Sequence, residues 1–383
     1  MQAFNFSTTA HLICASGAAA RLAEHCAERG ARNVLLVTDA GIVRHHLLDT
    51  VLPGFAAAGI NLQVYSDVLA DPAEVLVLAA TEQAQAMSAD LIVGFGGGSS
   101  MDTAKLVAYL AHPAQRQGLS DIYGVNQASG TRLPLIQVPT TAGTGSEVTP
   151  ISIVTTATGK SGVVSPQLLP DLAILDAQLT VGLPGAVTAA TGIDAMVHAI
   201  EAYTSKLRKN PISDLLAREA LRLLSTHLEQ AVREPQDLEA RQAMLLGACL
   251  AGQAFANAPV AAVHALAYPL GTTFHLPHGL SNALVLNQVL AFNLPDAREH
   301  YAALAPCVLG ERLAPGDAAA QFIDEMQRLH AAVGLPLRLR DAGVTLESLP
   351  ELARSAMQQQ RLLVNNPRTV LEADALAIYT AAY

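Results

Sequence analysis

Tryptophan is absent from the sequence, and aromatic residues of all kinds make up only 4% of it. Charged residues are also scarce, at 15%, and acidic side chains outnumber basic ones, which gives a formal net charge of −10. This acidic balance argues against nucleic acid or an anionic membrane surface as a partner, and its simplest consequence is solubility. The apolar residues, 51% of 383, are enough for a large core, and the length suits two domains.

Closely spaced cysteines and long apolar runs are missing as well. The four cysteines lie far apart and form no CxxC pair, which is typical of reduced thiols in a cytoplasmic protein. The first residues, MQAFNFSTTAHLICASG, lack the basic start and the apolar run of a signal peptide. No apolar stretch reaches the length of about 18 residues that predicts a membrane span. We therefore expect a cytoplasmic protein with no membrane and no nucleic acid as partner.

The first half of the chain alternates between short apolar runs and Ala-rich segments. The segments 71–89 and 101–112 are expected to be helices, and Pro72 suits the start of the first. Strands that alternate with helices predict an α/β domain built on a doubly wound, Rossmann-like parallel sheet. The strands are expected at 33–39, 62–68, 90–100 and 133–141.

The pattern changes twice in the rest of the chain. Two β-rich segments between 147 and 176, joined by a Thr-Gly-Lys turn, predict a hairpin that closes the first domain. After about residue 183 strand signals disappear, and Ala/Leu-rich segments broken by prolines and glycines indicate helices. We therefore expect an α/β domain over 1–182 and an all-helical domain over 183–383.

A glycine-rich turn, GFGGGSSMD, lies where the expected strand at 90–100 meets the next helix. Gly96, Gly97 and Gly98 allow the backbone to bend sharply and to approach a ligand closely, and Ser99 or Ser100 can cap the helix. A helix N-terminus with free N–H groups suits a pyrophosphate. The alternative is a plain tight turn, because Ser99 stands where the G-x-G-x-x-G fingerprint has its third glycine.

Asp39 ends the strand expected at 33–39, which suits a carboxylate that accepts hydrogen bonds from an adenosine ribose and repels a 2′-phosphate. A turn aspartate before Ala-Gly is an equally simple explanation. The polar turn PTTAGTGSE, 139–147, follows another expected strand, and its hydroxyls and glycines suit the same ligand.

A carboxylate and three imidazoles form a candidate metal site in the second half. In GIDAMVHAIEAY, Asp194 and His198 are four residues apart, so both lie on one face of an otherwise apolar helix. The segment HALAYPLGTTFHLPHG adds His264 and His278. Such a set suits Fe²⁺ or Zn²⁺. The alternative is a buried Asp–His pair with two unrelated core histidines.

Taken together, these motifs resemble the iron-containing, or group III, alcohol dehydrogenase family. The resemblance runs nearly end to end through VTDAG, GGGSSMDTAK, PTTAGTGSEVT, TGIDAMVHAIEAY, HALAYPLG, LPHGLSNALVL and NNPR. It implies NAD as cofactor, a dinucleotide-binding α/β domain, a helical catalytic domain and at least a homodimer. The implied metal ligands are Asp194, His198, His264 and His278. The implied cofactor contacts are Asp39, Gly97, Gly98, Ser99, Asp102, Thr140, Thr141, Thr144 and Lys160.

The sequence departs from the family pattern at Tyr268, where many members carry a histidine four residues after the third metal ligand. A tyrosine hydroxyl ordinarily titrates far above an imidazole, so a simple imidazole proton relay is in doubt. We assign Tyr268 and the remaining histidine of the segment, His275, as candidate catalytic residues. His275 is favoured as a neighbour of the metal ligands, and the alternatives are a substrate contact or a surface residue.

The expected reaction is hydride transfer between a small primary alcohol or its aldehyde and NAD(H), with Fe²⁺, or Zn²⁺, as Lewis acid. The alternative is a hydroxyacid dehydrogenase, such as one for 4-hydroxybutyrate, or a hydroxyacid–oxoacid transhydrogenase, because the Tyr-Pro pair at 268 and 269 resembles that branch of the family. The scarcity of basic residues near the ligand motifs disfavours acid substrates. The Asp-x-x-x-His pair argues against glycerol dehydrogenase, and a non-catalytic regulator on the same scaffold is a third possibility.

Overall fold

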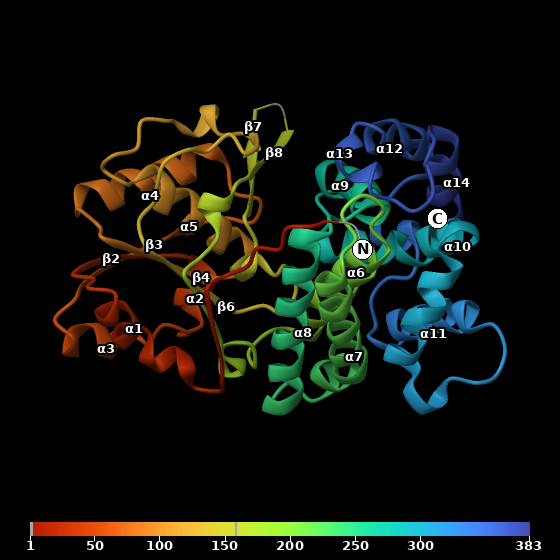
Figure 1. Cartoon of the computed structure of the whole chain (residues 1–383), viewed down its shortest axis with the longest axis horizontal. Coiled ribbons are helices and arrows are strands. Elements are labelled where there is room, and N and C mark those ends of the chain that lie inside the picture. Colours follow the sequence, from red (N-terminus) through yellow and green to blue (C-terminus); the bar gives the residue numbers. More distant parts are fainter. Residues whose placement is uncertain (1–2, 158) are drawn as a thin grey trace. The chain divides into compact units, whose positions relative to one another are not determined.

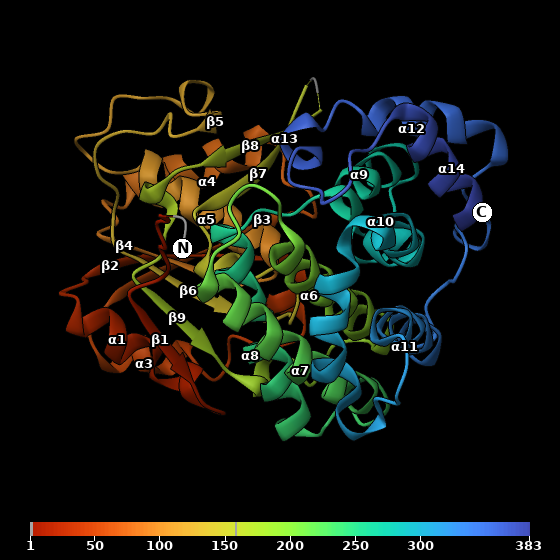
Figure 2. The same ribbon diagram turned by 45° about the vertical axis from the view of Figure 1, so that its right-hand side comes forward.

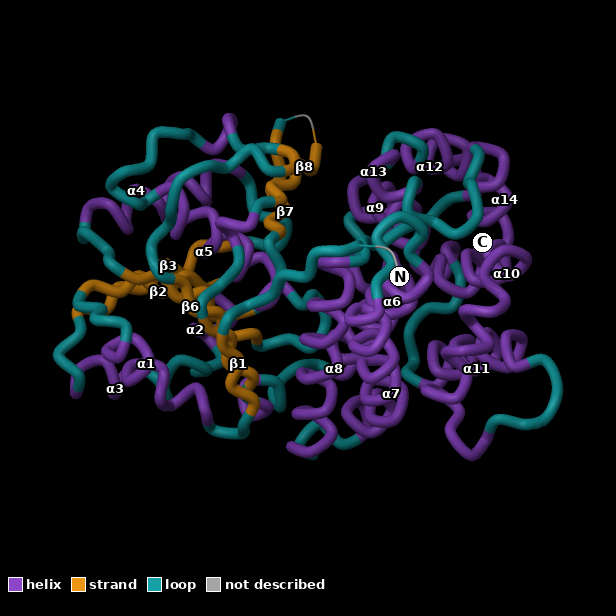
Figure 3. Tube along the Cα trace, viewed as in Figure 1, coloured by secondary structure: helices purple, strands orange, loops and turns teal. Residues whose placement is uncertain are grey.

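The computed structural model describes residues 3–157 and 159–383, and these residues form two compact units. The first, here called the sheet unit, comprises 8–141 and 145–182. The second, here called the helical unit, comprises the described residues before Thr8 together with 142–144 and 183–383. Strands occur in the sheet unit, whereas the helical unit consists of helices and loops (Figure 3).

Six parallel strands form the main sheet of the sheet unit, in the order β1-β9-β6-β4-β2-β3. Their bounds are β1 His11–Cys14, β2 Asn33–Asp39, β3 Asn61–Val68, β4 Leu91–Gly96, β6 Leu135–Pro139 and β9 Leu172–Leu175. The helices of this unit are α1 Leu22–Glu28, α2 Ala40–Arg44, α3 Leu52–Ala57, α4 Glu74–Ala86 and α5 Gly98–Leu110.

Helices cover both faces of this sheet, because its strands are apolar on both sides. Along β2 successive side chains point to opposite faces. Val34 and Leu36 join one core with side chains of α1 and α3, whereas Leu35 and Val37 join another with side chains of α4 and α5. Figure 1 shows these two helix pairs on opposite sides of the strands. The predicted doubly wound parallel sheet is confirmed.

The β-rich segment before residue 176 divides differently from the expectation. The hairpin is formed by β7 (Ile151–Thr156) and β8 (Gly159–Val164), and β5 (Gly124–Val125) pairs with β8 to complete a three-stranded sheet. The chain then leaves the hairpin at Pro166, and β9 returns to the main sheet between β1 and β6. Proline has no N–H to donate to a strand ladder, which explains why the apolar segment cannot continue as one strand.

The helical unit is arranged around α6, which is buried from Gly192 to Thr204. This helix packs against α7, α8 and α10, while α9 packs against α10 and α12 (Figure 2). The long helices are α6 Gly185–Thr204, α7 Pro211–Arg233, α8 Leu238–Asn257, α9 Ala262–Phe274, α10 His278–Leu309 and α11 Ala318–Ala332. The shorter ones are α12 Leu349–Ala356, α13 Gln360–Leu363 and α14 Glu372–Ala382.

No single helix in the described part of the chain has the length and apolar character needed to cross a membrane. The pair α8 and α9, bent by 106°, meets those criteria only when both helices are taken together, by length and composition alone.

Candidate functional site

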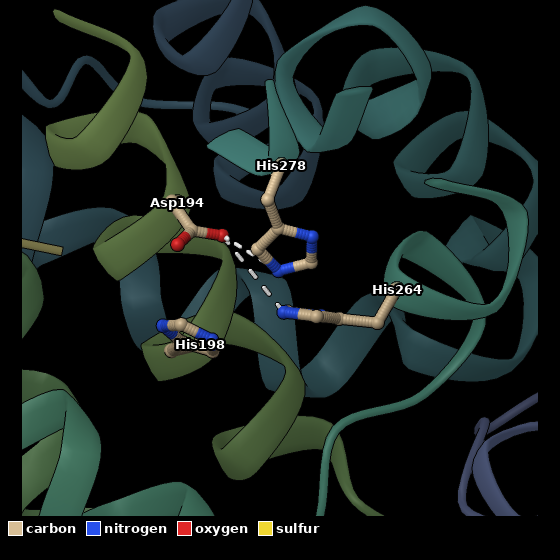
Figure 4. A group of neighbouring side chains, drawn as sticks. All are labelled: Asp194, His198, His264 and His278. Atoms are coloured by element: carbon tan, nitrogen blue, oxygen red, sulfur yellow. Dashed lines mark ion pairs between the residues drawn. The ribbon is translucent and has the colours of Figure 1, made fainter. Parts of the chain in front are cut away.

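Four side chains of the helical unit converge on one point. Asp194 and His198 come from α6, His264 from α9, and His278 is the first residue of α10. One ligand atom from each lies within 4.8 Å of those of the other three. Figure 4 shows the carboxylate and the imidazoles pointing toward one another from these three helices. The structure therefore brings together all four residues that the sequence nominated.

The spacing of these atoms fits a divalent cation. Asp194 Oδ1 lies 3.9 Å from His264 Nε2 and 3.6 Å from His278 Nε2. Ligands about 2.1 Å from a tetrahedral ion are separated from one another by roughly 3.4 Å, so these atoms need to move only slightly. One carboxylate and three imidazoles are a donor set that suits Fe²⁺ or Zn²⁺.

Burial and mutual contact also favour the protonation states that a metal requires. Burial lowers the pKa of the His198 imidazole to about 3, which leaves it neutral near pH 7. Burial by itself raises the pKa of the Asp194 carboxyl, but the three imidazoles and the Asn282 amide lower it, and the balance lies below the ordinary value. A neutral imidazole and an ionised carboxylate are the forms that bind metal ions.

Two further buried residues contact the cluster, and sequence reasoning missed both. Glu201 Oε2 accepts a hydrogen bond from His264 Nδ1 at 2.7 Å. Asn282 Nδ2 donates to Asp194 Oδ1 at 2.5 Å and lies 3.3 Å from Nε2 of both His264 and His278. The available signal was helical spacing: Glu201 follows Asp194 by seven residues and Asn282 follows His278 by four, which places each on the same face as a ligand.

Aromatic rings border the cluster on two sides. Phe255 stacks on His198 with ring centroids 4.4 Å apart. The Tyr268 ring lies 5.9 Å from the His278 ring, so the structure places this candidate residue beside a nominated ligand. His275 is exposed, ends α9 in a left-handed conformation (φ 54°), and its part in catalysis stays a prediction.

The glycine-rich turn of the sheet unit joins β4 to α5. Gly96 has φ 149°, and a Cβ there would lie 2.7 Å from Ser100 Oγ, so any side chain at this position would be strained. Gly97 rather than a serine occupies the N-cap position, and among the described residues no side chain caps α5. The N–H groups of Gly98 and Ser99, the first two residues of this helix, are therefore available to an anion.

Asp39 lies at the same edge of the sheet as this turn, because β2 and β4 pair directly. Its Oδ1 caps α2 by accepting from the N–H groups of Gly41 and Ile42, at 2.8 and 3.1 Å. Its Oδ2 accepts from Ser100 Oγ at 3.4 Å. The carboxylate thus touches the turn, as the sequence-based assignment of both to one ligand requires.

The three threonines that follow β6, which were nominated as cofactor contacts, belong to different units. The Thr140 N–H donates to Gly96 O at 2.9 Å, and a Cβ added to Gly97 would be in ordinary van der Waals contact with the Thr141 side chain, 3.7 Å from its Oγ1. Thr144 lies with the helical unit. Lys160, on β8, forms an ion pair with Asp71 at 2.7 Å.

Asp102 takes part in a buried polar cluster that the sequence did not suggest. Its Oδ1 accepts from Ser146 Oγ at 2.5 Å and its Oδ2 from the Ile153 N–H at 2.9 Å. Lys105, which is fully buried, lies 3.5 Å from Asp102 Oδ1 and also donates to Ser146 Oγ at 2.7 Å. Glu147 is buried beside them, and burial raises the pKa of its carboxyl to about 7. The cluster ties α5 to the segment that follows β6.

Comparison with known proteins gives one consistent assignment. The iron-containing alcohol dehydrogenase family model matches residues 9–177, and the C-terminal model of the Fe-containing alcohol dehydrogenase family matches 188–383. Long-chain-alcohol dehydrogenase 1 of Geobacillus thermodenitrificans (strain NG80-2) is 42% identical over 370 residues, which cover 96% of this chain and 93% of that protein.

Solved structures agree with this assignment. A crystal structure of 1,3-propanediol oxidoreductase is similar over 100% of both chains, with a TM-score of 0.95 and 34% identity. Sulfoacetaldehyde reductase from Bifidobacterium kashiwanohense, solved in complex with NAD⁺, has a TM-score of 0.88 and 26% identity over 100% of this chain and 99% of its own. The resemblance inferred from the motifs is thereby confirmed, and the chain belongs to the iron-containing alcohol dehydrogenase family.

Proposed function

We propose that this alcohol dehydrogenase family member transfers hydride between a small primary alcohol, or its aldehyde, and NAD(H), with a divalent metal, Fe²⁺ or Zn²⁺, held by Asp194, His198, His264 and His278. The observation that carries the proposal is the convergence of one buried carboxylate and three imidazoles within 4.8 Å. A divalent ion held by these residues would supply a Lewis acid for the substrate oxygen, and a nicotinamide would supply the hydride acceptor or donor.

The side chains around the cluster set the environment of the substrate oxygen. Phe255 and the buried apolar parts of α6 and α9 exclude water from one side of the ligands, which strengthens electrostatic interactions there. Tyr268, beside His278, is proposed to orient a proton-carrying water through its hydroxyl or to shape the pocket through its ring. His275 is proposed as a second proton-handling group near the protein surface.

The sheet unit is proposed to bind the dinucleotide. Its pyrophosphate would be held by the turn at Gly97, Gly98 and Ser99 and by the N-terminus of α5. Asp39 would accept hydrogen bonds from the adenosine ribose and repel a 2′-phosphate, which makes NAD(H) the expected partner over NADP(H). Asp102, Lys160, Thr140 and Thr141 complete the proposed contacts of this unit, and Thr144, which belongs to the helical unit, is proposed as a further contact. The NAD⁺ complex of the sulfoacetaldehyde reductase supports this choice of cofactor.

The test is NAD⁺ reduction over a panel of primary alcohols and 4-hydroxybutyrate, with protein loaded anaerobically with Fe²⁺ or with Zn²⁺. The metal-loaded protein should oxidise alcohols, and His264→Ala should lose both the metal and activity while its circular dichroism is retained. His227→Ala is the matched control, since His227 lies on α7, outside the cluster, and its Nδ1 lies 2.9 Å from the Leu223 carbonyl oxygen of the same helix. Turnover by metal-free protein, or oxidation of the hydroxyacid alone, would overturn the proposal.

The cofactor assignment has a separate test. Asp39→Gly should narrow the preference for NAD⁺ over NADP⁺, and equal use of both by the wild type would contradict a ribose contact. A homodimer or larger assembly and a cytoplasmic location stay predictions, which light scattering and cell fractionation can measure.

A further inference from the structure

A third titratable residue is buried on the helix that carries two of the nominated ligands. Glu201 is 3% exposed, and it lies on α6 seven residues after Asp194 and three after His198. Its carboxylate accepts three hydrogen bonds: from His264 Nδ1 at 2.7 Å, from the Val263 N–H at 2.6 Å and from the Ala261 N–H at 2.8 Å. All three donors belong to the start of α9, so one carboxylate links two helices.

We propose that Glu201 is a positioning residue for the metal centre. It holds His264 with Nδ1 protonated and Nε2 directed at the ion, and it fixes the start of α9 relative to α6. The inference rests on the proposed metal centre, because it assigns a role to a residue that supports one of the four ligands and is not itself a ligand.

The direction of the imidazole follows from hydrogen-bond chemistry. Both oxygens of Glu201 accept backbone N–H groups from the start of α9, so the side chain acts as an acceptor and the His264 nitrogen that faces it acts as the donor. In a neutral imidazole the lone pair is then on Nε2, the atom that lies 3.9 Å from Asp194 Oδ1. Two acceptor atoms directed at each other repel unless a cation or a donor lies between them, and here Asn282 Nδ2 contacts both, at 2.5 Å from Asp194 Oδ1 and 3.3 Å from His264 Nε2. A carboxylate behind a metal-binding imidazole fixes the tautomer and strengthens the ligand.

The position of His264 depends on the same carboxylate. Helices begin with N–H groups that have no partner within the helix, and a side chain at the N-cap usually accepts from one of them. The N-cap of α9 is Ala261, which has no such side chain. Glu201, on the neighbouring helix α6, takes the place of the missing N-cap acceptor. A carboxylate also suits the positive end of the helix dipole at an N-terminus. His264 follows directly after the anchored residues, so its ring is tied to the helix of Asp194 and His198.

The experiment compares Glu201→Gln with Glu325→Gln in the full-length protein. A glutamine keeps the size of Glu201 but removes the charge, and its amide has a single acceptor oxygen. Glu325 is a matched control, because it is also buried in the helical unit, at 5% exposed, and hydrogen-bonded by Arg312 and Arg328. The readouts are the Zn²⁺ dissociation constant, from competition with a chelating dye, and the visible d–d spectrum of the Co²⁺-loaded protein.

We expect Glu201→Gln to weaken Zn²⁺ binding about 10–100-fold and to change the Co²⁺ spectrum. Glu325→Gln should leave both unchanged even if its melting temperature falls. A Glu201→Gln protein that binds Zn²⁺ within about threefold of wild type and shows the wild-type spectrum would overturn the inference, as would equal weakening by Glu325→Gln.

The same measurements separate this inference from the proposed function. A wild-type protein that binds metal tightly but oxidises no alcohol would overturn the proposed reaction, while the effect of Glu201 on metal binding would stand. Failure of the wild-type protein to bind either ion would overturn the metal centre and the inference with it.

Discussion

Three buried titratable side chains lie on one face of α6. Asp194, His198 and Glu201 are 2%, 5% and 3% exposed. Burying such groups without partners is unfavourable by several kcal/mol, so they must be paired with one another or with a shared cation. Their partners come from α9 and α10, which explains why three helices converge here. Tyr268 lies beside these residues, with its ring 5.9 Å from that of His278.

Tyr268→Phe separates a role for the hydroxyl from a role for the ring. If the hydroxyl orients a proton-carrying water, kcat should fall about 10²–10⁴-fold at unchanged metal content. If only the ring matters, the change should appear in substrate range. Steady-state kinetics over several alcohols make the distinction, and wild-type kinetics throughout would leave Tyr268 without a catalytic part.

The matched control for this variant is Tyr379→Phe. The buried Tyr379 hydroxyl donates to the Leu266 carbonyl on α9, so its removal affects the same helix. It should lower the free energy of unfolding by about 0.5–1.5 kcal/mol and leave kcat unchanged.

Packing between whole elements decides where the ligands lie. The N-terminus of α10, which carries His278, approaches the backbone of α6 at Gly279. A Cβ on Gly279 would lie 2.4 Å from the Ala190 carbonyl oxygen and 3.3 Å from Asp194 Cβ. Backbone at this distance cannot move aside without shifting a helix, so the glycine permits the contact on which the cluster depends.

Gly279→Ala should therefore displace α10 from α6, weaken Zn²⁺ binding, and lower the free energy of unfolding by about 1–3 kcal/mol. The control is Gly271→Ala in α9, where the nearest atom to a new Cβ is the Leu276 carbonyl at 3.5 Å. That change should be neutral or stabilising by up to about 1 kcal/mol, since alanine favours helices over glycine. Urea unfolding and dye competition measure both, and an equal effect of the two substitutions would contradict this account.

The free energy of unfolding should depend on pH through Glu147, which lies in the segment between β6 and β7. Burial raises the pKa of this carboxyl to about 7 from an unfolded value near 4.5, and nearby Lys105 lowers it in part. The folded state therefore holds a proton that the unfolded chain releases. This stabilisation is fully present below pH 4.5 and is lost as the pH rises through 7, and its size is at most about 3 kcal/mol.

Glu147→Gln should remove this dependence. The melting temperature of the variant relative to wild type should rise between pH 5 and pH 8, because the uncharged amide cannot ionise. A difference that stays constant with pH would show that Glu147 titrates near its ordinary value in the folded protein.

At the scale of the whole molecule, the metal ion and NAD are proposed to bind to residues of different units. All four nominated metal ligands belong to the helical unit, whereas Asp39 and the glycine-rich turn belong to the sheet unit. A ligand that binds only the folded state stabilises it by about 2.7 kcal/mol when present at a hundredfold excess over its Kd.

Zn²⁺ should accordingly raise the melting temperature, and a chelator should reverse the effect. His264→Ala should abolish the shift produced by Zn²⁺ but keep the shift produced by NAD⁺. Calorimetry with each ligand alone provides the measurement. A variant that retains the Zn²⁺ shift would place the metal elsewhere.

Much of the architecture and of the candidate site was determined by local sequence patterns. Short apolar runs that alternate with helical segments were enough to predict the parallel sheet, because strands buried on both faces are apolar throughout. The i, i+4 spacing placed Asp194 and His198 on one face of a helix, and three consecutive glycines marked the turn after β4. The motifs together identified the family, which the comparisons confirmed.

The tertiary structure alone decided which distant residues meet. Glu201 contacts a histidine 63 residues away, Asn282 contacts an aspartate 88 residues away, and Lys105 lies against Ser146, 41 residues further along the chain. The tertiary structure also decided that β9 returns to the main sheet and that His275 is exposed. Local spacing determines which face of an element a side chain occupies, but the partner of that face depends on how helices and strands pack, and no single segment encodes that packing.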